Sequence, residues 1–300
     1  MTGIASVQLG AGLAAKLFAT VTPAAVTGLR LWFATALLAA FGARGLADTV
    51  REITAKRAWR DAAVAVAFGL TLGVMNFSIY QSFARIPLGI AVTIEFLGPL
   101  AVAVVSSRRL IDLLWVALAG AGVALLSRGG TSPALPGHGP HGTGLAWAGI
   151  AFALVAAACW AAYILLSAAT GRRFGGSSGL VIAMLVAAVV VTGPAVGTAT
   201  AALGRPEVLA AGLGIGLLSS VIPYRLELET LRRIPAKVFG IWMSLEPAVA
   251  ALVGLVVLGQ ALAVSEWAAV GCVMAACAGA ARGRGGPAPG GQDQLPPPAG

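Results

Sequence analysis

The stretch RIPLGIAVTIEFLGP, which spans Arg85–Pro99, returns as RIPAKVFGIWMSLEP at Arg233–Pro247. Both copies begin with Arg-Ile-Pro and end with proline. Each also carries one glutamate, Glu95 or Glu246, within an otherwise apolar run. Self-similarity of this kind predicts that the chain consists of two related halves. The halves share a scaffold, and each places an acid where apolar residues dominate.

Composition places the chain in a lipid bilayer. Hydrophobic residues make up 58% and charged residues 10% of its 300 residues, against roughly 45–50% and 25% in ordinary globular domains. The net charge of +9 comes from residues scattered in short connections, without a basic stripe or interleaved aromatic side chains. We therefore expect no nucleic-acid partner. These features predict a polytopic membrane protein whose partners are the lipid bilayer and a small-molecule substrate.

Runs of about 18–25 apolar residues are long enough to cross a bilayer core of about 30 Å. The sequence holds ten such runs, at 3–20, 24–42, 62–84, 88–106, 110–127, 144–169, 177–198, 207–231, 236–258 and 262–281. We predict an all-α membrane protein of ten transmembrane helices, five in residues 1–127 and five in residues 144–281. A Gly/Pro/His-rich linker occupies 128–143, and a Pro/Gly-rich tail, which we expect to be disordered, occupies 282–300. The stretch ARGLADTVREITAKRAWR, at 43–60, is expected to be a connection.

The distribution of arginine and lysine predicts the orientation in the membrane. With the N-terminus in the cytoplasm, Arg85, Arg128 and Arg205 fall in outer connections, and most other basic residues fall in cytoplasmic ones. Short cytoplasmic connections carry an excess of positive charge, so we predict that both termini are cytoplasmic. Since five is an odd number of spans, the second half must enter the membrane inverted. Many transporters are built from such inverted repeats, with the substrate site between them.

Glu95 and Glu246 fall deep within predicted spans, about 10 Å and 15 Å along their helices at about 1.5 Å per residue. They do not occupy equivalent positions of the repeat, since Glu95 corresponds to Met243. Glu246 corresponds to Gly98. A charged residue at such depth costs roughly 2.5–3.5 kcal/mol on insertion scales and usually faces a bundle interior or a wet cavity. Each glutamate is a candidate for proton coupling or for binding a substrate amine, or else a protonated group that joins two helices.

Other side chains in the predicted spans are candidates for lining the same site. Arg30 lies about two turns into the second span, where it binds a substrate carboxylate, pairs with a buried glutamate or extends toward the outer surface. Asn76 and Tyr80 are four residues apart and share a helix face. Trp160 and Tyr163 also share a face, either as a cavity wall or as part of an aromatic belt.

Further polar candidates are Ser6, Gln8, Glu227 and Ser244. The candidate kinks and hinges are Pro87, Pro99, Pro223, Pro235 and Pro247. Proline removes a backbone hydrogen bond, so Pro223 should kink its helix and release carbonyl groups that a neighbour or substrate must satisfy. Two pairs of glycines at small-xxx-small spacing, Gly69 with Gly73 and Gly212 with Gly216, would permit close helix packing.

The sequence predicts neither a metal site nor a cofactor. Cys159, Cys272 and Cys277 fall within apolar runs at spacings that fit neither a metal site nor a disulfide framework. His138 and His141 lie in the linker without nearby carboxylates or thiols. We therefore interpret the cysteines as small packing residues.

Several of these motifs together carry a resemblance that extends over about Ala5–Ala281. They are PLGIAV and EF.GPLAVA..SSRR in Pro87–Arg109, ACWAAYIL at Ala158–Leu165, PYRLE at Pro223–Glu227 and RIPAKVFGIWMSLEPAVAA at Arg233–Ala251. On them the chain resembles the drug/metabolite transporter superfamily, in its EamA-type ten-helix branch. Within that branch it is similar to bacterial inner-membrane exporters of threonine and homoserine. The resemblance implies two five-helix EamA repeats and proton-driven export of small hydrophilic amino acids.

We accordingly expect a secondary exporter rather than an enzyme. A zwitterionic substrate would place its ammonium near Glu95 or Glu246 and its carboxylate near Arg30 or a helix N-terminus. One alternative is an EamA-type efflux protein for other metabolites or drugs. An intramembrane enzyme is less favoured, because no metal cluster and no nucleophile with a base is evident. A polytopic receptor is disfavoured by the lack of a soluble output domain, and the oligomeric state stays open.

Overall fold

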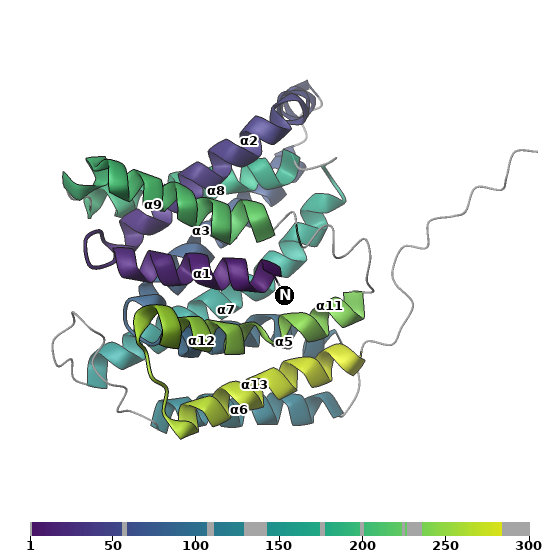
Figure 1. The fold of residues 1–300 in the computed structure, drawn as a ribbon. Coiled ribbons are helices and arrows are strands. Elements are labelled where there is room, and N and C mark those ends of the chain that lie inside the picture. Colours follow the sequence, from purple (N-terminus) through teal and green to yellow (C-terminus); the bar gives the residue numbers. More distant parts are fainter. Residues whose placement is uncertain are drawn as a thin grey trace, which may run out of the picture.

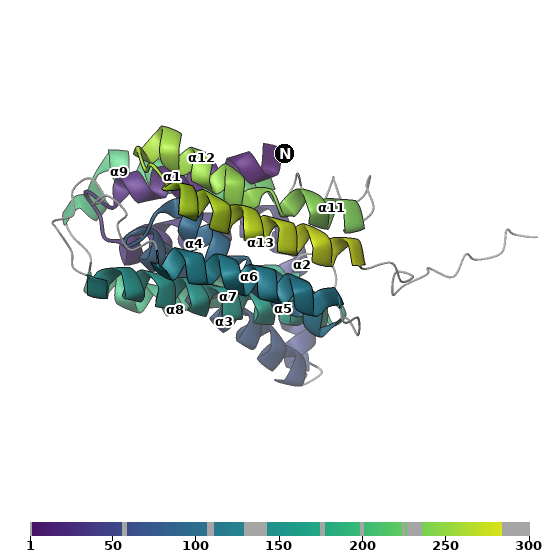
Figure 2. The same cartoon turned by 90° about the horizontal axis from the view of Figure 1, so that it is seen from below.

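The computed structural model describes residues 2–55, 59–106, 111–128, 143–174, 178–198, 201–223, 226 and 236–283. In this part of the chain the secondary structure is helical, and the helices form one elongated bundle (Figures 1 and 2). The linker 128–143, apart from its two ends, and the tail beyond residue 283 lie outside the described residues. The predictions for them therefore stay predictions.

Each of the ten predicted spans is helical over most of its described residues, and residues 224–225 and 227–231 of the eighth span lie outside the described part of the chain. Those of the first half are α1 (Thr2–Leu17), α2 (Pro23–Ala55), α3 (Trp59–Phe83), α4 (Leu88–Glu95), α5 (Leu97–Val105) and α6 (Ile111–Arg128). Those of the second half are α7 (Thr143–Gly171), α8 (Ser178–Gly197), η1 (Ala201–Gly204), α9 (Pro206–Gly216), η2 (Leu217–Val221), α11 (Ala236–Met243), α12 (Glu246–Leu258) and α13 (Val264–Gly283). Seven segments are long and apolar enough to cross a membrane. The prediction of an all-α, multi-span membrane protein is confirmed.

One predicted connection is helical over most of its length. The apolar membrane-length part of α2 is Pro23–Ala40, close to the predicted span 24–42, but the helix itself continues to Ala55 through most of the stretch 43–60. That stretch is rich in alanine, arginine, glutamate and leucine, which favour helix, and it holds no proline. Nothing local ends the helix where hydrophobicity ends.

Two other spans, which were expected to be continuous, are interrupted. The fourth breaks at Phe96 between α4 and α5, and the ninth breaks between α11 and α12. Proline cannot donate a hydrogen bond to the carbonyl four residues before it. For Pro99 that carbonyl belongs to Glu95, the last residue of α4, and for Pro247 it belongs to Met243, the last residue of α11. The two copies of the repeated motif therefore break their helices at the same register.

Corresponding spans of the two halves pack on each other in opposite directions. In the fourth and ninth spans, Gly89 of α4 lies against Ala251 of α12, and Leu88 lies near Gly254. Between α2 and α8, Gly28 lies against Ala195, and Trp32, one turn further along α2, donates to the hydroxyl of Thr192, which comes earlier in α8. A third antiparallel contact of this kind joins α6 to α13, which form a pair at one edge of the bundle (Figure 1). The start of α1 and the end of α13 lie at the same end of the bundle (Figures 1 and 2).

Small residues allow the closest approaches between helices, as the sequence predicted. A Cβ atom added at Gly69 would lie 2.6 Å from the carbonyl oxygen of Ala183, and one at Gly73 would lie 3.2 Å from the Cα of Ala187. Both contacts join α3 to α8. Gly212 and Gly216 bring α9 against α2 in the same way, although less tightly. Van der Waals packing of this kind holds helices together where lipid removes the hydrophobic driving force.

The two broken spans have unequal surroundings. Helix α4 packs on α12, α7, α3 and α13, whereas the described residues of α11 pack mainly on α13. Leu88, at the start of α4, donates its backbone N–H to the side-chain oxygen of Gln260 at 2.9 Å. This contact ties the first half to the second at the end of the bundle opposite the termini.

Candidate functional site

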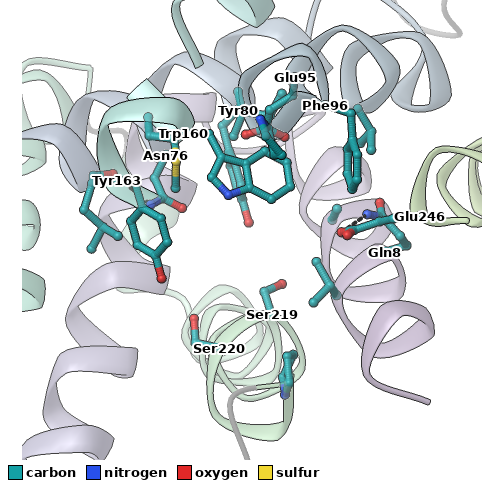
Figure 3. A pocket seen from close by; sticks show the side chains of 18 of the residues that line it. Gln8, Asn76, Tyr80, Glu95, Phe96, Trp160, Tyr163, Ser219, Ser220 and Glu246 are labelled. Atoms are coloured by element: carbon teal, nitrogen blue, oxygen red, sulfur yellow. Dashed lines mark hydrogen bonds between the residues drawn. The ribbon is translucent and has the colours of Figure 1, made fainter. Parts of the chain in front are cut away.

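A cavity of about 390 Å³ lies in the middle of the bundle, between the two halves. Its walls come from α1, α2, α3, α4, α5, α7, α11, α12 and the segment η2–Pro223, with one residue from α8. Figure 3 shows polar and aromatic side chains from these elements pointing into one space. Volumes of about 300–1,000 Å³ are typical of small-molecule sites.

Most of the residues predicted from the sequence meet in this cavity. Those in its wall are Gln8, Arg30, Asn76, Tyr80, Glu95, Trp160, Tyr163, Glu246, Pro99 and Pro223. Ser244 is not among them: its hydroxyl donates to the carbonyl of Ile241 at 2.6 Å, at the break between α11 and α12. Pro87 precedes α4, and Pro247 lies in the first turn of α12. Glu227 and Pro235 lie outside the described residues.

Glu246 is buried and is held by α1. Its Oε1 atom accepts a hydrogen bond of 2.9 Å from Nε2 of Gln8 (Figure 3). The two residues are 7% and 2% exposed. Gly12, one turn further along α1, lies against Val253 of α12 and lets the two helices approach closely enough for this bond. The bond therefore joins the first helix of one half to the fourth of the other.

Arg30 enters the cavity from α2 and contacts two neutral acceptors. It donates from Nη1 to the hydroxyl of Tyr80 at 3.2 Å and from Nη2 to the carbonyl of Ser219 at 3.5 Å. Its guanidinium also lies 5.4 Å from the centre of the Tyr80 ring. The Nε atom of Arg30 is buried and has no partner. The guanidinium is thus fixed in position by groups that do not neutralise its charge.

The carbonyl that Arg30 contacts is available because of Pro223. Segment η2 is a π-helix, in which the N–H of Ile222 bonds to the carbonyl of Leu217, five residues back. Pro223 has no N–H to offer the carbonyls of Leu218 and Ser219. The hydroxyl of Ser6 donates to the Leu218 carbonyl at 2.8 Å, and Arg30 takes the other. Neighbours thus satisfy the released carbonyls, as the sequence predicted for this proline.

Glu95 differs from Glu246 in its surroundings. It ends α4, lies in the cavity wall, and has no hydrogen bond among the described residues. Arg30 lines the same cavity, but no ion pair within 4 Å joins it to Glu95. The cavity thus contains a carboxyl group and a guanidinium that do not form an ion pair with each other.

Aromatic rings close one side of the cavity. Trp160 of α7 meets Phe96 edge-on, with ring centres 4.9 Å apart. Tyr163, one turn further along α7, packs against Phe68 of α3 with ring centres 5.2 Å apart. The sequence left open whether Trp160 and Tyr163 belong to an interfacial belt or to a cavity wall. The structure places both in the wall.

Sequence reasoning missed Phe96, Ser219 and Ser220. Both serines lie across the cavity from Tyr80 and Glu95 (Figure 3) and are buried. A signal for Ser219 exists, because it is the residue whose carbonyl Pro223 leaves without a helical donor. Phe96 marks the break that Pro99 imposes on its span, which gives a weaker signal of the same kind.

The described residues contain no group of three or more histidine, cysteine, aspartate or glutamate side chains that could hold a metal ion. Cys159, Cys272 and Cys277 are half-buried thiols within helices. His138 and His141 lie outside the described residues. The donors around the cavity are those of a site that recognises an organic molecule by hydrogen bonds and charge.

Membrane-length helices, around a cavity that both halves build and that holds charged and polar side chains, define a multi-pass membrane transporter. Residues 147–282 match the EamA-like transporter family. Over 279 residues the chain is 38% identical to the threonine/homoserine exporter RhtA of Escherichia coli (strain K12), covering 93% of this chain and 88% of that protein. The exporter of the same name from Salmonella typhimurium (strain LT2) is 38% identical over 282 residues, with the same coverage. The chain belongs to the EamA-like transporter family.

A solved crystal structure has the same fold. It covers 92% of this chain and 94% of its own length with a TM-score of 0.58, at 17% sequence identity. Family membership confirms the prediction that the chain is a transporter and not an enzyme. It also confirms a multi-pass membrane protein related to bacterial exporters.

Proposed function

We propose that the chain is a secondary active exporter of small hydrophilic amino acids, threonine- or homoserine-like, in a bacterial inner membrane. The observation that carries the proposal is a cavity between the halves that holds two carboxyl groups and one guanidinium. Such a set matches the two charges of a zwitterion. Relatives that are 38% identical over 93% of the chain export threonine and homoserine, according to their names, and this supports the substrate class.

We further propose that the bundle consists of two inverted repeats, residues 1–127 and 144–281, with both termini in the cytoplasm. Three observations support this. Corresponding spans pack antiparallel, and the repeated motif breaks its helix at the same register in each half. The start of α1 and the end of α13 also lie at the same end of the bundle (Figure 1). Transporters with inverted repeats bind substrate between the repeats and expose it alternately on the two sides.

Proton coupling would use a cavity carboxyl group. Buried carboxyl groups within transmembrane helices commonly serve proton relays, and a proton exchanged at Glu95 or Glu246 would bias the equilibrium between inward- and outward-facing states. The described titratable and charged side chains in the cavity wall are Arg30, Tyr80, Glu95, Tyr163 and Glu246. Export would then follow the proton gradient.

The test is efflux from an exporter-deficient bacterial strain that expresses the chain. Cells are loaded with labelled threonine or homoserine, and the loss of label is followed with and without a protonophore. Accelerated efflux that collapses with the protonophore supports the proposal. Normal membrane insertion without efflux of either amino acid overturns the substrate assignment. Efflux at the same rate with and without the protonophore overturns proton coupling.

Two variants connect the efflux to the cavity. Glu95→Gln and Glu246→Gln keep the size of each side chain and remove its charge and its exchangeable proton. Both should abolish gradient-driven efflux without reducing the amount of protein in the membrane. Glu207→Gln, at an exposed position in the first turn of α9, is the matched control and should export normally. Normal export by both cavity variants would refute this role for the two acids.

A second candidate function is efflux of other metabolites or drugs. The aromatic wall made by Trp160, Tyr163 and Phe96 favours it, because such surfaces accept apolar groups of varied shape. Growth of the same strain on a panel of toxic compounds and amino-acid analogues distinguishes the two. Resistance confined to amino-acid analogues supports the first function, and resistance to unrelated drugs supports the second.

A further inference from the structure

We propose that Arg30 and Glu95 hold opposite ends of one substrate, with the carboxylate of an α-amino acid at Arg30 and its ammonium group at Glu95. The inference rests on the proposed function and assigns a polarity to the same cavity. It also assigns the substrate class: molecules that carry both a carboxylate and an ammonium, in preference to amines or acids that carry one.

The anion end follows from the contacts of Arg30. Its hydrogen-bond partners, the Tyr80 hydroxyl and the Ser219 carbonyl, are neutral acceptors. No ion pair to Arg30 is formed by the described residues, and its Nε donor is buried without a partner. A charge removed from water needs a counter-charge as well as hydrogen bonds. Two neutral contacts fix the planar guanidinium, so its remaining N–H groups are available to a carboxylate, the anion that its geometry suits.

The cation end follows from the position of Glu95. It is the last residue of α4, and Pro99 deprives its main-chain carbonyl of the usual helical donor. An ionised carboxylate beside a main-chain carbonyl that lacks its helical donor offers only acceptors, whereas an ammonium group offers only donors. The two sets are complementary.

Glu246 is less suited to the ammonium group. Its Oε1 atom already accepts a hydrogen bond from Gln8. Of the two acids that the sequence left as alternatives, the structure therefore points to Glu95 for the substrate.

Arg30 and Glu95 are separated, and we place the substrate between them. Both line the same cavity, yet no direct ion pair joins them. A zwitterion lying between the two would give each charge a counter-charge. The side chain of the substrate is then left to the rest of the cavity wall, where Asn76, Ser220 and Tyr163 offer polar groups.

Competition in inside-out membrane vesicles tests this polarity. Such vesicles take up the substrates of an exporter, and uptake of labelled threonine is measured against three unlabelled competitors. These are threonine, the amino alcohol threoninol, which lacks the carboxylate, and 3-hydroxybutyrate, which lacks the ammonium. Loss of one charge-assisted contact weakens binding by about tenfold or more. Each analogue should therefore need at least about ten times the threonine concentration to halve uptake.

The outcomes separate the inference from the proposed function. Wild-type vesicles that take up neither threonine nor homoserine overturn both. Uptake that either analogue inhibits as well as threonine overturns the polarity alone and leaves the exporter standing. This measurement uses the wild-type chain, so it does not depend on how any variant folds.

Two variants then place each end. Arg30→Gln should weaken competition by threonine about tenfold and leave threoninol unchanged. Glu95→Gln is tested by exchange of labelled threonine in vesicles loaded with unlabelled threonine, which needs no proton gradient. In this assay it should weaken competition by threonine to a similar degree and leave 3-hydroxybutyrate unchanged. Glu207→Gln is the control and should alter none of the three. Equal weakening of all three competitors by both variants would show that the residues act only on the structure, and would overturn the assignment.

Discussion

The contact between α4 and α12 makes a quantitative prediction for Gly89→Ala. The added Cβ would lie 2.7 Å from the Cα and the Cβ of Ala251, whereas carbon atoms pack best at about 3.5–4.0 Å. The two helices must therefore separate by about 1 Å. The bond from the Leu88 N–H to Gln260, now 2.9 Å, would lengthen to about 3.9 Å, beyond the range of a hydrogen bond.

These changes give a net free energy. Overpacking costs about 1–3 kcal/mol, and the lost hydrogen bond adds about 0.5–1.5 kcal/mol. Alanine recovers about 0.5–1 kcal/mol, because glycine is the poorer residue within a helix. The variant should be about 0.5–4 kcal/mol less stable, with about 2 kcal/mol as the central value, which corresponds to a fall of about 5 °C in the unfolding midpoint.

Thermal unfolding of the purified protein in detergent measures the effect. The matched control is Gly120→Ala in α6, where an added Cβ meets nothing within 4 Å. The control should be as stable as the wild type, or up to about 1 kcal/mol more stable. A Gly89→Ala protein as stable as the control would refute the reasoning, because it would show that the two helices are not in close backbone contact.

Two further substitutions test the hydrogen bonds of the site and of the surface. Pro223→Ala restores an N–H that can bond to the carbonyl of Ser219 and withdraw it from Arg30. Threonine uptake into vesicles should then fall about tenfold, since a charge-assisted contact is lost, although the amount of protein should not fall. Arg173→Gln breaks a 3.1 Å ion pair with Asp61 in which both side chains are more than a third exposed. It should change the free energy of unfolding by less than about 1 kcal/mol.

Each of these has its own control and its own refuting result. Pro194→Ala removes the proline within α8, at an exposed position away from the cavity, and should leave uptake unchanged. If Pro223→Ala transports like the wild type, the π-helix does not position Arg30. If Arg173→Gln is as unstable as Gly89→Ala, the surface ion pair contributes far more than its exposure allows.

The spans and most of the cavity residues could be predicted from the sequence for one physical reason. Lipid penalises polar side chains and unsatisfied backbone, so charged residues within apolar runs are few and tend to face an interior cavity. Glu95, Glu246 and Arg30 stood out in this way, and all three reach the same cavity. The end of α2 could not be predicted from hydrophobicity, because a helix can continue into water when its residues favour helix.

The pairing of side chains could not be predicted. Gln8 and Glu246 meet across almost the whole length of the chain, and which helix faces which is decided by packing that no local pattern encodes. Ser219 escaped notice for a different reason. Serine is tolerated in helices when its hydroxyl bonds to the backbone, so its presence alone carries little information. Its importance comes from the carbonyl that Pro223 releases.

The unequal surroundings of α4 and α11 have a consequence for the transport cycle. Both helices begin copies of one motif, yet α4 is docked against α12 and α7, whereas the described part of α11 packs mainly on α13. In the proposed inverted arrangement, the counterparts of α12 and α7 are α5 and α1. The opposite state of the transport cycle is then expected to dock α11 against α5 and α1, and to release α4 from α12 and α7.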